Sequence, residues 1–121
     1  MKLLLGFIFL VFFFSGCYYD KANLVYPVAT ACDTSNVTYS VTVTGILNTN
    51  CYTCHSGSAS SGGGIKLDSY GNLKIYVTNG QLLSSINQTG AVPSMPLNSG
   101  KLSSCDINKI TAWINSGSVN N

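Results

Sequence analysis

The sequence contains no arginine and no glutamate, and its charged side chains are six lysines and four aspartates. Without a cluster of basic residues there is no surface suited to a phosphate backbone, so nucleic acid is not an expected partner. There is a single histidine, His55, which excludes a metal site built from several histidines of this chain. What remains is a polar surface made mostly of Asn, Ser, Thr and Gly.

The apolar run at the N-terminus is too short for a permanent membrane span. After Met1 and Lys2 it extends over residues 3–14, roughly 18 Å of helix against a hydrocarbon core of ~30 Å. A positive start, a short apolar stretch and the small residues Ser15 and Gly16 are typical of an export signal. We therefore expect residues 1–16 to be a signal peptide.

The next residues resemble a bacterial lipobox. In Phe14-Ser15-Gly16-Cys17, Phe14 stands where the pattern prefers Leu. The resemblance implies that Cys17 becomes the lipid-carrying first residue; the alternative is an ordinary secretory signal followed by an unmodified cysteine. Tyr18 is not the Asp associated with inner-membrane retention in some bacteria, so the resemblance slightly favours the outer membrane. The expected location is the cell envelope, facing the periplasm.

The segment Cys51-Tyr52-Thr53-Cys54-His55 carries the strongest chemical signal. C-x-x-C-H is typical of c-type haem attachment. On a helical turn, residues i and i+3 share a face, so both thiols can reach the two vinyl groups at one porphyrin edge. His55 follows Cys51 by four residues, which carries its imidazole toward the same ring. The motif predicts one covalent haem c, with Cys51 and Cys54 as thioether sites and His55 as an iron ligand.

Two different chemistries that use paired cysteines fit the sequence less well. A redox dithiol of the thioredoxin type needs a βαβ pattern, which the sequence does not show. Structural zinc needs four ligands, and there is neither a second histidine nor a second C-x-x-C pair. Chance occurrence of the motif is the remaining alternative.

Met95 is the candidate for the opposite iron face. It is the only methionine beyond the signal peptide, and it lies between Pro93 and Pro96 in a stretch with little conformational freedom. Filling a gap in the core is the alternative role for a lone methionine. A thioether opposite His55 favours ferrous iron and leaves no vacant coordination position, which suits one-electron transfer rather than substrate chemistry.

Two of the five cysteines remain, Cys32 and Cys105. An exported protein reaches a compartment that permits disulfides, so we expect these two to pair; two free thiols are the alternative. Closing a loop of about 70 residues contributes roughly 4–5 kcal/mol by polymer-entropy arguments. The bridge would tie the segment before the haem motif to the start of the last helix.

The periodicity predicts an all-α domain over residues 37–121, preceded by a tether over residues 17–36. Near the motif, Val and Thr alternate as in a strand over residues 38–44, but the spacing of Val43, Ile46 and Leu47 favours a helix from about Ser40. Further helices are expected after an N-cap at Asp68, over residues 81–86, and for about 13 residues from a capping box at Ser103 to a stop at Gly117. Loops are expected over residues 56–64 and 90–100.

From about Val37 to Asn121 the chain resembles small bacterial cytochrome c domains, including the planctomycete-type cytochrome c family and related lipoproteins. The matching stretches are residues 45–57 (GILNTNCYTCHSG), 64–74, 93–97 and 101–117. The resemblance implies a small helical fold around one haem. It also implies Cys51 and Cys54 as thioether sites, His55 as proximal ligand and Met95 as distal ligand.

Together these observations predict a lipid-anchored monohaem cytochrome that carries one electron at a time and is not an enzyme. Its partners would be redox proteins of a respiratory or envelope electron-transfer chain, and the lipid would hold the protein at the membrane. One alternative is a haem-based sensor or minor peroxidase with a labile Met95, and another is an envelope lipoprotein without haem. For Trp113, Tyr70 and Tyr76, contact with the porphyrin and plain core packing are both compatible with the sequence.

Overall fold

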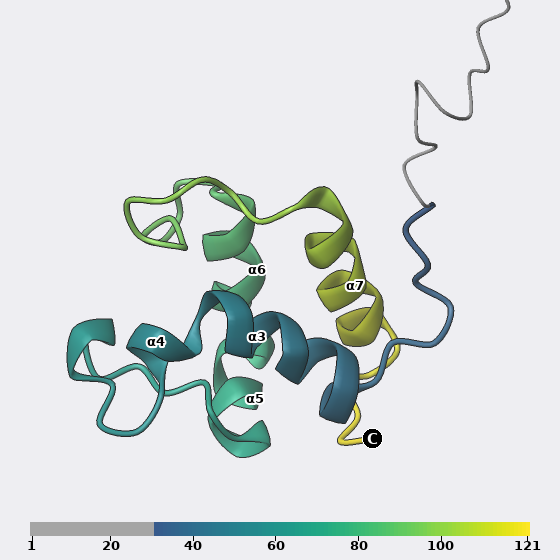
Figure 1. Ribbon diagram of the computed structural model, residues 1–121, viewed down its shortest axis with the longest axis horizontal. Helices are drawn as coiled ribbons and strands as arrows, with labels where there is room; N and C mark the ends of the chain where they lie inside the picture. Colours follow the sequence, from purple (N-terminus) through teal and green to yellow (C-terminus); the bar gives the residue numbers. More distant parts are fainter. Residues whose placement is uncertain (1–30) are drawn as a thin grey trace, which may run out of the picture. The chain divides into compact units, whose positions relative to one another are not determined.

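The computed structural model describes residues 31–121, which form helices joined by loops (Figure 1). No strand occurs within this range, so the predicted all-α class is confirmed. In chain order the elements are the π-helix η2 (Tyr39–Val43), α3 (Thr44–Asn50), α4 (Tyr52–His55), the 3₁₀-helix η3 (Ser60–Gly62), α5 (Tyr70–Thr78), α6 (Gln81–Asn87) and α7 (Ser104–Asn115).

The segment with alternating Val and Thr is helical, so the helix predicted from about Ser40 is confirmed and the strand is wrong. The amides of Thr42 and Val43 both donate to Thr38 O, at 3.1 and 3.0 Å, which makes a wide first turn. Thr44 keeps helical backbone angles, so η2 passes directly into α3. Helical spacing buries Val43, Ile46 and Leu47 on one face, and this burial outweighs the β propensity of the segment.

Helix α5 begins one residue later than predicted. Its N-cap is Ser69, whose hydroxyl accepts the amide of Asn72 at 3.3 Å, and the predicted cap at Asp68 is wrong. The Asp68 carboxylate instead accepts the amide of Gly57 at 2.8 Å. Both residue types can cap a helix, and Asp68 is already engaged by the preceding loop.

Helices α6 and α7 agree with the predictions. The Ser103 hydroxyl accepts the amide of Asp106 at 3.0 Å and donates to its carboxylate at 2.8 Å, as in a capping box. Gly117 follows the helix with φ of +100°, a conformation that glycine adopts without steric cost.

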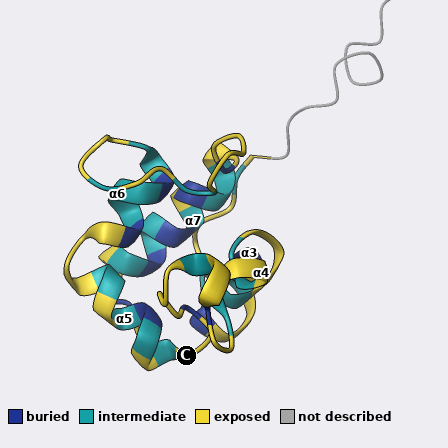
Figure 2. Cartoon of the chain, turned by 90° about the vertical axis from the view of Figure 1, so that its left-hand side faces the viewer, coloured by how far each residue is buried: buried dark blue, intermediate teal, exposed yellow. Residues whose placement is uncertain are grey.

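The core lies where the helices meet. Helix α7 contacts both η2 and α6, α5 contacts α6, and α4 contacts α3 and η3. Figure 2 shows that exposed residues dominate the loop after α4, whereas α7 carries several buried ones. The buried side chains come from all the longer elements: Tyr39, Val43, Ile46, Leu47, Leu67, Leu73, Leu82, Ile86, Leu102, Ile107, Ile110 and Trp113.

The residues after α7 fold back and close the domain. Trp113 is fully buried, and its indole N–H donates to Val119 O at 2.9 Å. Tyr39 and Ser40 donate their amides to the side-chain and main-chain oxygens of Asn121, both at 2.8 Å. The end of the chain therefore supplies acceptors for amides that the first turn of η2 cannot satisfy itself.

The predicted pairing of the two remaining cysteines is confirmed. Cys32 and Cys105 form a disulfide with a Cα–Cα distance of 5.4 Å, and the compact unit extends from Cys32 to Asn121. The predicted signal peptide (1–16) and the lipidation site Cys17 lie outside the described residues. Between residues 31 and 121, no helix has the length and apolar character needed to span a bilayer.

Candidate functional site

The C-x-x-C-H segment forms the predicted helical turn, with a bend at its first cysteine. The Cys51 amide donates to Leu47 O at 2.7 Å, which continues the ladder of α3. Cys51 then departs from helical angles, with φ of −127°, and α4 begins at the next residue. Its carbonyl accepts the amides of both Cys54 (3.1 Å) and His55 (2.9 Å). One carbonyl thus fixes the spacing between the two cysteines and the histidine.

The two thiols of the motif have different surroundings. Both are free, Cys51 is half-buried and Cys54 is exposed. Cys51 packs against the hydrophobic core, and burial raises the pKa of its thiol to about 11. Because loss of a proton would leave a charge in an apolar setting, Cys51 stays protonated at neutral pH. Covalent chemistry at the motif thus begins from one sheltered thiol and one accessible thiol.

His55 is buried, and its ring is oriented by a main-chain acceptor. The exposed fraction of the residue is 8%. Nδ1 lies 2.9 Å from the carbonyl oxygen of Ile65. A carbonyl only accepts, so this contact assigns the proton of the neutral ring to Nδ1 and leaves a lone pair on Nε2. His55 is therefore prepared to donate that lone pair to a metal.

A glycine allows the loop to pass close to this histidine. A β-carbon added at Gly62 would lie 2.5 Å from Cys54 O and 2.6 Å from His55 Nδ1. Any side chain at this position would displace the loop or the imidazole ring. Gly62 thus permits the approach that brings Ile65 O to His55, and the amide of Leu67 adds a 2.8 Å bond to His55 O.

Hydrogen bonds hold the Gly/Ser-rich loop after the motif at several points. Ala59 is buried, and its carbonyl accepts the amides of Gly62 and Gly64. The Asp68 carboxylate holds Gly57 at the other end of the loop, and that hydrogen bond is the main reason why the pKa of Asp68 lies below its usual range.

The contribution of Ile65 and Gly62 to the site could not be recognised in the sequence. A carbonyl acceptor and an absent side chain leave no chemical motif. The run of glycines over residues 62–64 was the available signal.

Met95 lies in the loop between α6 and α7, as predicted. Its amide donates to Ser85 O at 3.1 Å, its peptide bond to Pro96 is cis, and its side chain is half-buried. It is not among the side chains packed on the core, and no hydrogen bond in the described part of the chain joins it to His55. The role of Met95 as the second iron ligand therefore remains a prediction.

Core packing accounts for the three aromatic residues considered as porphyrin contacts. Trp113 stacks on Tyr39 with ring centroids 5.8 Å apart, and Tyr39 meets Tyr70 edge-on at 5.2 Å. The Tyr70 hydroxyl donates to Ser118 O at 2.8 Å. Tyr76 is half-buried against the same core. These contacts account for the burial of the three aromatic side chains.

Two further features bear on the nature of the site. Over residues 31–121, no three His, Cys, Asp or Glu side chains gather in a group that could hold a metal ion. A surface hollow lies on α5, lined by Gly71, Lys74, Ile75, Thr78 and Asn79. It contains none of the predicted site residues.

In comparisons with known proteins, no family model, curated protein or solved structure matches this chain. The resemblance to cytochrome c domains therefore rests on the motifs of the sequence alone.

Proposed function

We propose that this protein is a monohaem c-type cytochrome that carries single electrons in the cell envelope, anchored by a lipid on Cys17. The observation that carries the proposal is the state of His55 within C-x-x-C-H. The imidazole is buried, its Nδ1 is engaged by Ile65 O at 2.9 Å, and its Nε2 has no hydrogen-bond partner in residues 31–121. In a thioredoxin-type motif or a motif that occurs by chance, the histidine is not a metal ligand, so neither reading explains a buried ring with one nitrogen engaged and the other unpaired.

The residues present fit a covalent haem. Cys51 and Cys54 are free thiols on one helical turn, and each would add its S–H across a porphyrin vinyl group, with no leaving group. His55 offers a nitrogen donor, Nε2, while its other nitrogen, Nδ1, is hydrogen-bonded to a carbonyl, which fixes the tautomer and the orientation of the ring. Met95 offers a neutral sulfur on a loop with prolines on both sides.

When bound, haem supplies a one-electron couple at its iron. The residues of this chain would do the rest: two thioethers at Cys51 and Cys54 would hold the group, and His55 and Met95 would be its iron ligands. The thioether of Met95 is a weak, neutral donor, so it would favour the reduced state and raise the potential. With two ligands from the protein, the iron would favour electron transfer over chemistry on a bound substrate.

The surroundings of the site suit encounters that depend little on charge. Residues 34–65 and 75–100 contain no Lys or Asp, and the first charged residues after the motif, Lys66 and Asp68, carry opposite charges. Redox proteins of a respiratory or envelope chain are the proposed partners, with the lipid keeping this protein at the membrane surface. The partner would supply or accept the electron.

The test is visible spectroscopy on protein produced with a haem-attachment system. We expect haem that stays with the polypeptide on a denaturing gel, and a far-red sulfur-to-iron band in the oxidised protein that Met95→Ala abolishes. Cys51→Ser combined with Cys54→Ser should give colourless protein. Fast carbon monoxide binding by the reduced wild type, without the far-red band, would support the sensor alternative instead. Colourless wild-type protein with both motif thiols open to alkylation would refute haem attachment.

A further inference from the structure

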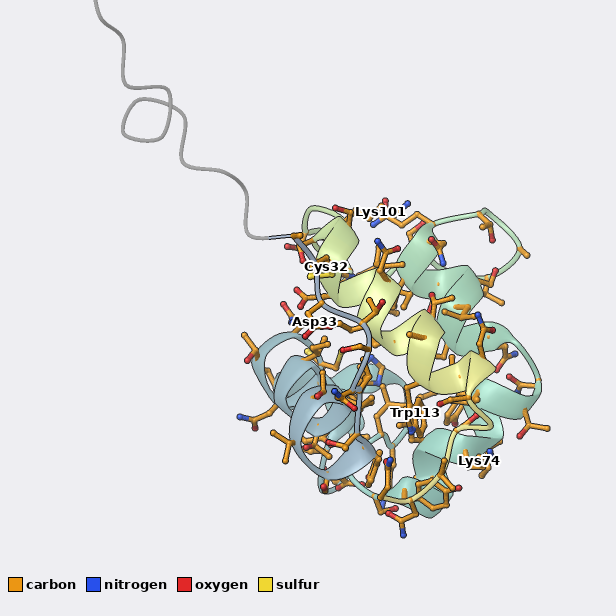
Figure 3. The ribbon with its side chains drawn as sticks, turned by 90° about the vertical axis from the view of Figure 1, so that its right-hand side faces the viewer. Cys32, Asp33, Lys74, Lys101 and Trp113 are labelled. Atoms are coloured by element: carbon orange, nitrogen blue, oxygen red, sulfur yellow. A yellow bond between two sulfur atoms is a disulfide. The ribbon has the colours of Figure 1, made fainter. Side chains whose placement is uncertain are left out.

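The segment between Cys32 and the first helix connects the two ends of α7. The disulfide holds its beginning at the N-terminal end of α7, and the segment enters η2 near the C-terminal end of α7. Cys105 is the second residue of α7, whereas Tyr39 is hydrogen-bonded to Asn121, beyond the C-terminal end of α7. From Cys105 to the end of α7 the helix is about 15 Å long. The segment 32–37 must therefore run along α7, and Figures 1 and 3 both show it beside this helix.

Within this segment, residues 33–36, which we call the strap, are held by little besides the disulfide at Cys32. All its residues are exposed, and the hydrogen bonds of its side chains, from Ser35 to Asp33 and from Asn36 to Ser35, stay within the strap. Its one link to α7 besides the bridge is the weak attraction of Lys109 for Asp33, an exposed carboxylate. Val37 is the first residue after the strap that packs on the core.

We infer that the Cys32–Cys105 bridge determines where the N-terminal part of the chain leaves the domain. With the bridge, Cys32, the first residue of the compact unit, is fixed at the start of α7 (Figure 3). Without it, the strap would separate and the first fixed residue would be Val37, at the other end of α7. The bridge would therefore determine at which end of α7 the link to an anchor is attached. This meaning rests on the proposed anchoring at Cys17, but the geometry does not.

The shift is large enough to measure. A random coil of 15 residues, the number from Cys17 to Cys32, has a root-mean-square length of about 20 Å. Loss of the bridge would move the fixed end of such a coil by about 15 Å along α7 and would add the strap to its length. A probe at Cys17 would then spend its time near a different set of residues.

The experiment uses the secreted mature chain without lipid, labelled at Cys17 with a nitroxide, and measures the broadening of backbone amide signals by NMR. In the wild type we expect the strongest broadening at residues 101–106 and the weakest at residues 118–121. In the Cys32→Ser, Cys105→Ser double variant this order should reverse. Asp33→Ala, which breaks the turn within the strap but keeps the bridge, is the matched control and should retain the wild-type pattern.

Several outcomes would overturn the inference. The inference is wrong if the double variant shows the same order of broadening as the wild type, or if Asp33→Ala reverses that order. It is also wrong if broadening in the wild type is strongest around Tyr39, and this outcome can be read even if the double variant does not fold. Failure of the proposed function is seen separately: with haem attached, mass spectrometry finds one nitroxide, on Cys17, whereas free Cys51 and Cys54 would also be labelled. If Cys51 and Cys54 are free, the wild type and the double variant are compared in proteins in which Cys51 and Cys54 are both replaced by serine.

Discussion

Replacing Gly62 with alanine tests the link between the loop and the histidine of the site. The added β-carbon would lie 2.5 Å from Cys54 O and 2.6 Å from His55 Nδ1. Neither neighbour is the free end of a flexible side chain, since one is backbone and the other belongs to a buried ring. Relief therefore requires the loop to retreat, which also lengthens the 2.9 Å contact between Nδ1 and Ile65 O.

The expected loss of stability combines two costs. Overpacking at a close contact typically costs about 1–3 kcal/mol, and loss of one buried hydrogen bond adds about 1 kcal/mol. A total of about 2–4 kcal/mol corresponds to a fall in Tm on the order of 10–25 °C for a domain of this size. Thermal unfolding followed by circular dichroism measures it.

Gly71→Ala is the matched control, because Gly71 lies in α5 with nothing within 4 Å of an added β-carbon. There alanine should raise the unfolding free energy by up to about 1 kcal/mol, since it restricts the unfolded chain and favours the helix. A second readout separates positioning of His55 from general loosening. In the proposed haem-bound protein, a weaker bond at Nδ1 would make the imidazole a poorer donor to ferric iron, so the reduction potential of Gly62→Ala should rise while that of Gly71→Ala stays constant. A Gly62→Ala protein with wild-type Tm and potential would refute the reasoning.

Four further predictions follow from other contacts of the domain. Ser103→Ala removes the acceptor for the Asp106 amide and should lower the unfolding free energy in urea by about 1 kcal/mol, whereas exposed Ser104→Ala should change it by less than about 0.5 kcal/mol. In haem-free protein at pH 8, Cys54 should be alkylated faster than Cys51, whose pKa is raised by burial to about 11; equal rates would show that Cys51 is not sheltered. Because the unfolded thiol ionises first, near pH 8.5, the unfolding free energy of this form should fall by at most about 2–3 kcal/mol between pH 8.5 and 11, and Cys51→Ala should remove that part of the slope. The pKa of Asp68 is lowered chiefly by the Gly57 amide, so its stabilising contribution is full above about pH 4 and is lost as the pH falls through its folded pKa. The protection factor of the Gly57 amide, which corrects for the intrinsic slowing of exchange in acid, should therefore fall as the pH falls through that pKa and should be lower in Asp68→Asn than in the wild type at neutral pH; wild-type protection in that variant would contradict the role of Asp68.

Features encoded by neighbouring residues could be predicted from the sequence. The turn from Cys51 to His55 and the capping box of α7 depend on contacts three or four residues apart, so their spacing predicts their geometry. The Cys32–Cys105 bridge spans 73 residues, but it followed once the remaining cysteines had been given roles in an exported chain.

The rest depends on contacts that side-chain patterns do not record. The acceptor for His55 is a main-chain carbonyl, which every residue possesses, so Ile65 could not be distinguished from its neighbours. The choice of Ser69 over Asp68 as helix cap depends on a distant loop that already uses the carboxylate. Val and Thr near Tyr39 favour a strand locally, and only burial against α7 decides for a helix.

The bonds from Tyr39 and Ser40 to Asn121 have a consequence for how the chain acquires its fold. A polypeptide synthesised only part of the way to Asn121 lacks these acceptors at the beginning of η2, because Asn121 lies 82 residues beyond Tyr39. Loop closure on that scale comes late and is slow compared with local helix formation. The first turn of η2 is therefore completed only after Asn121 has been made and has reached it, later than the helices that form from local contacts.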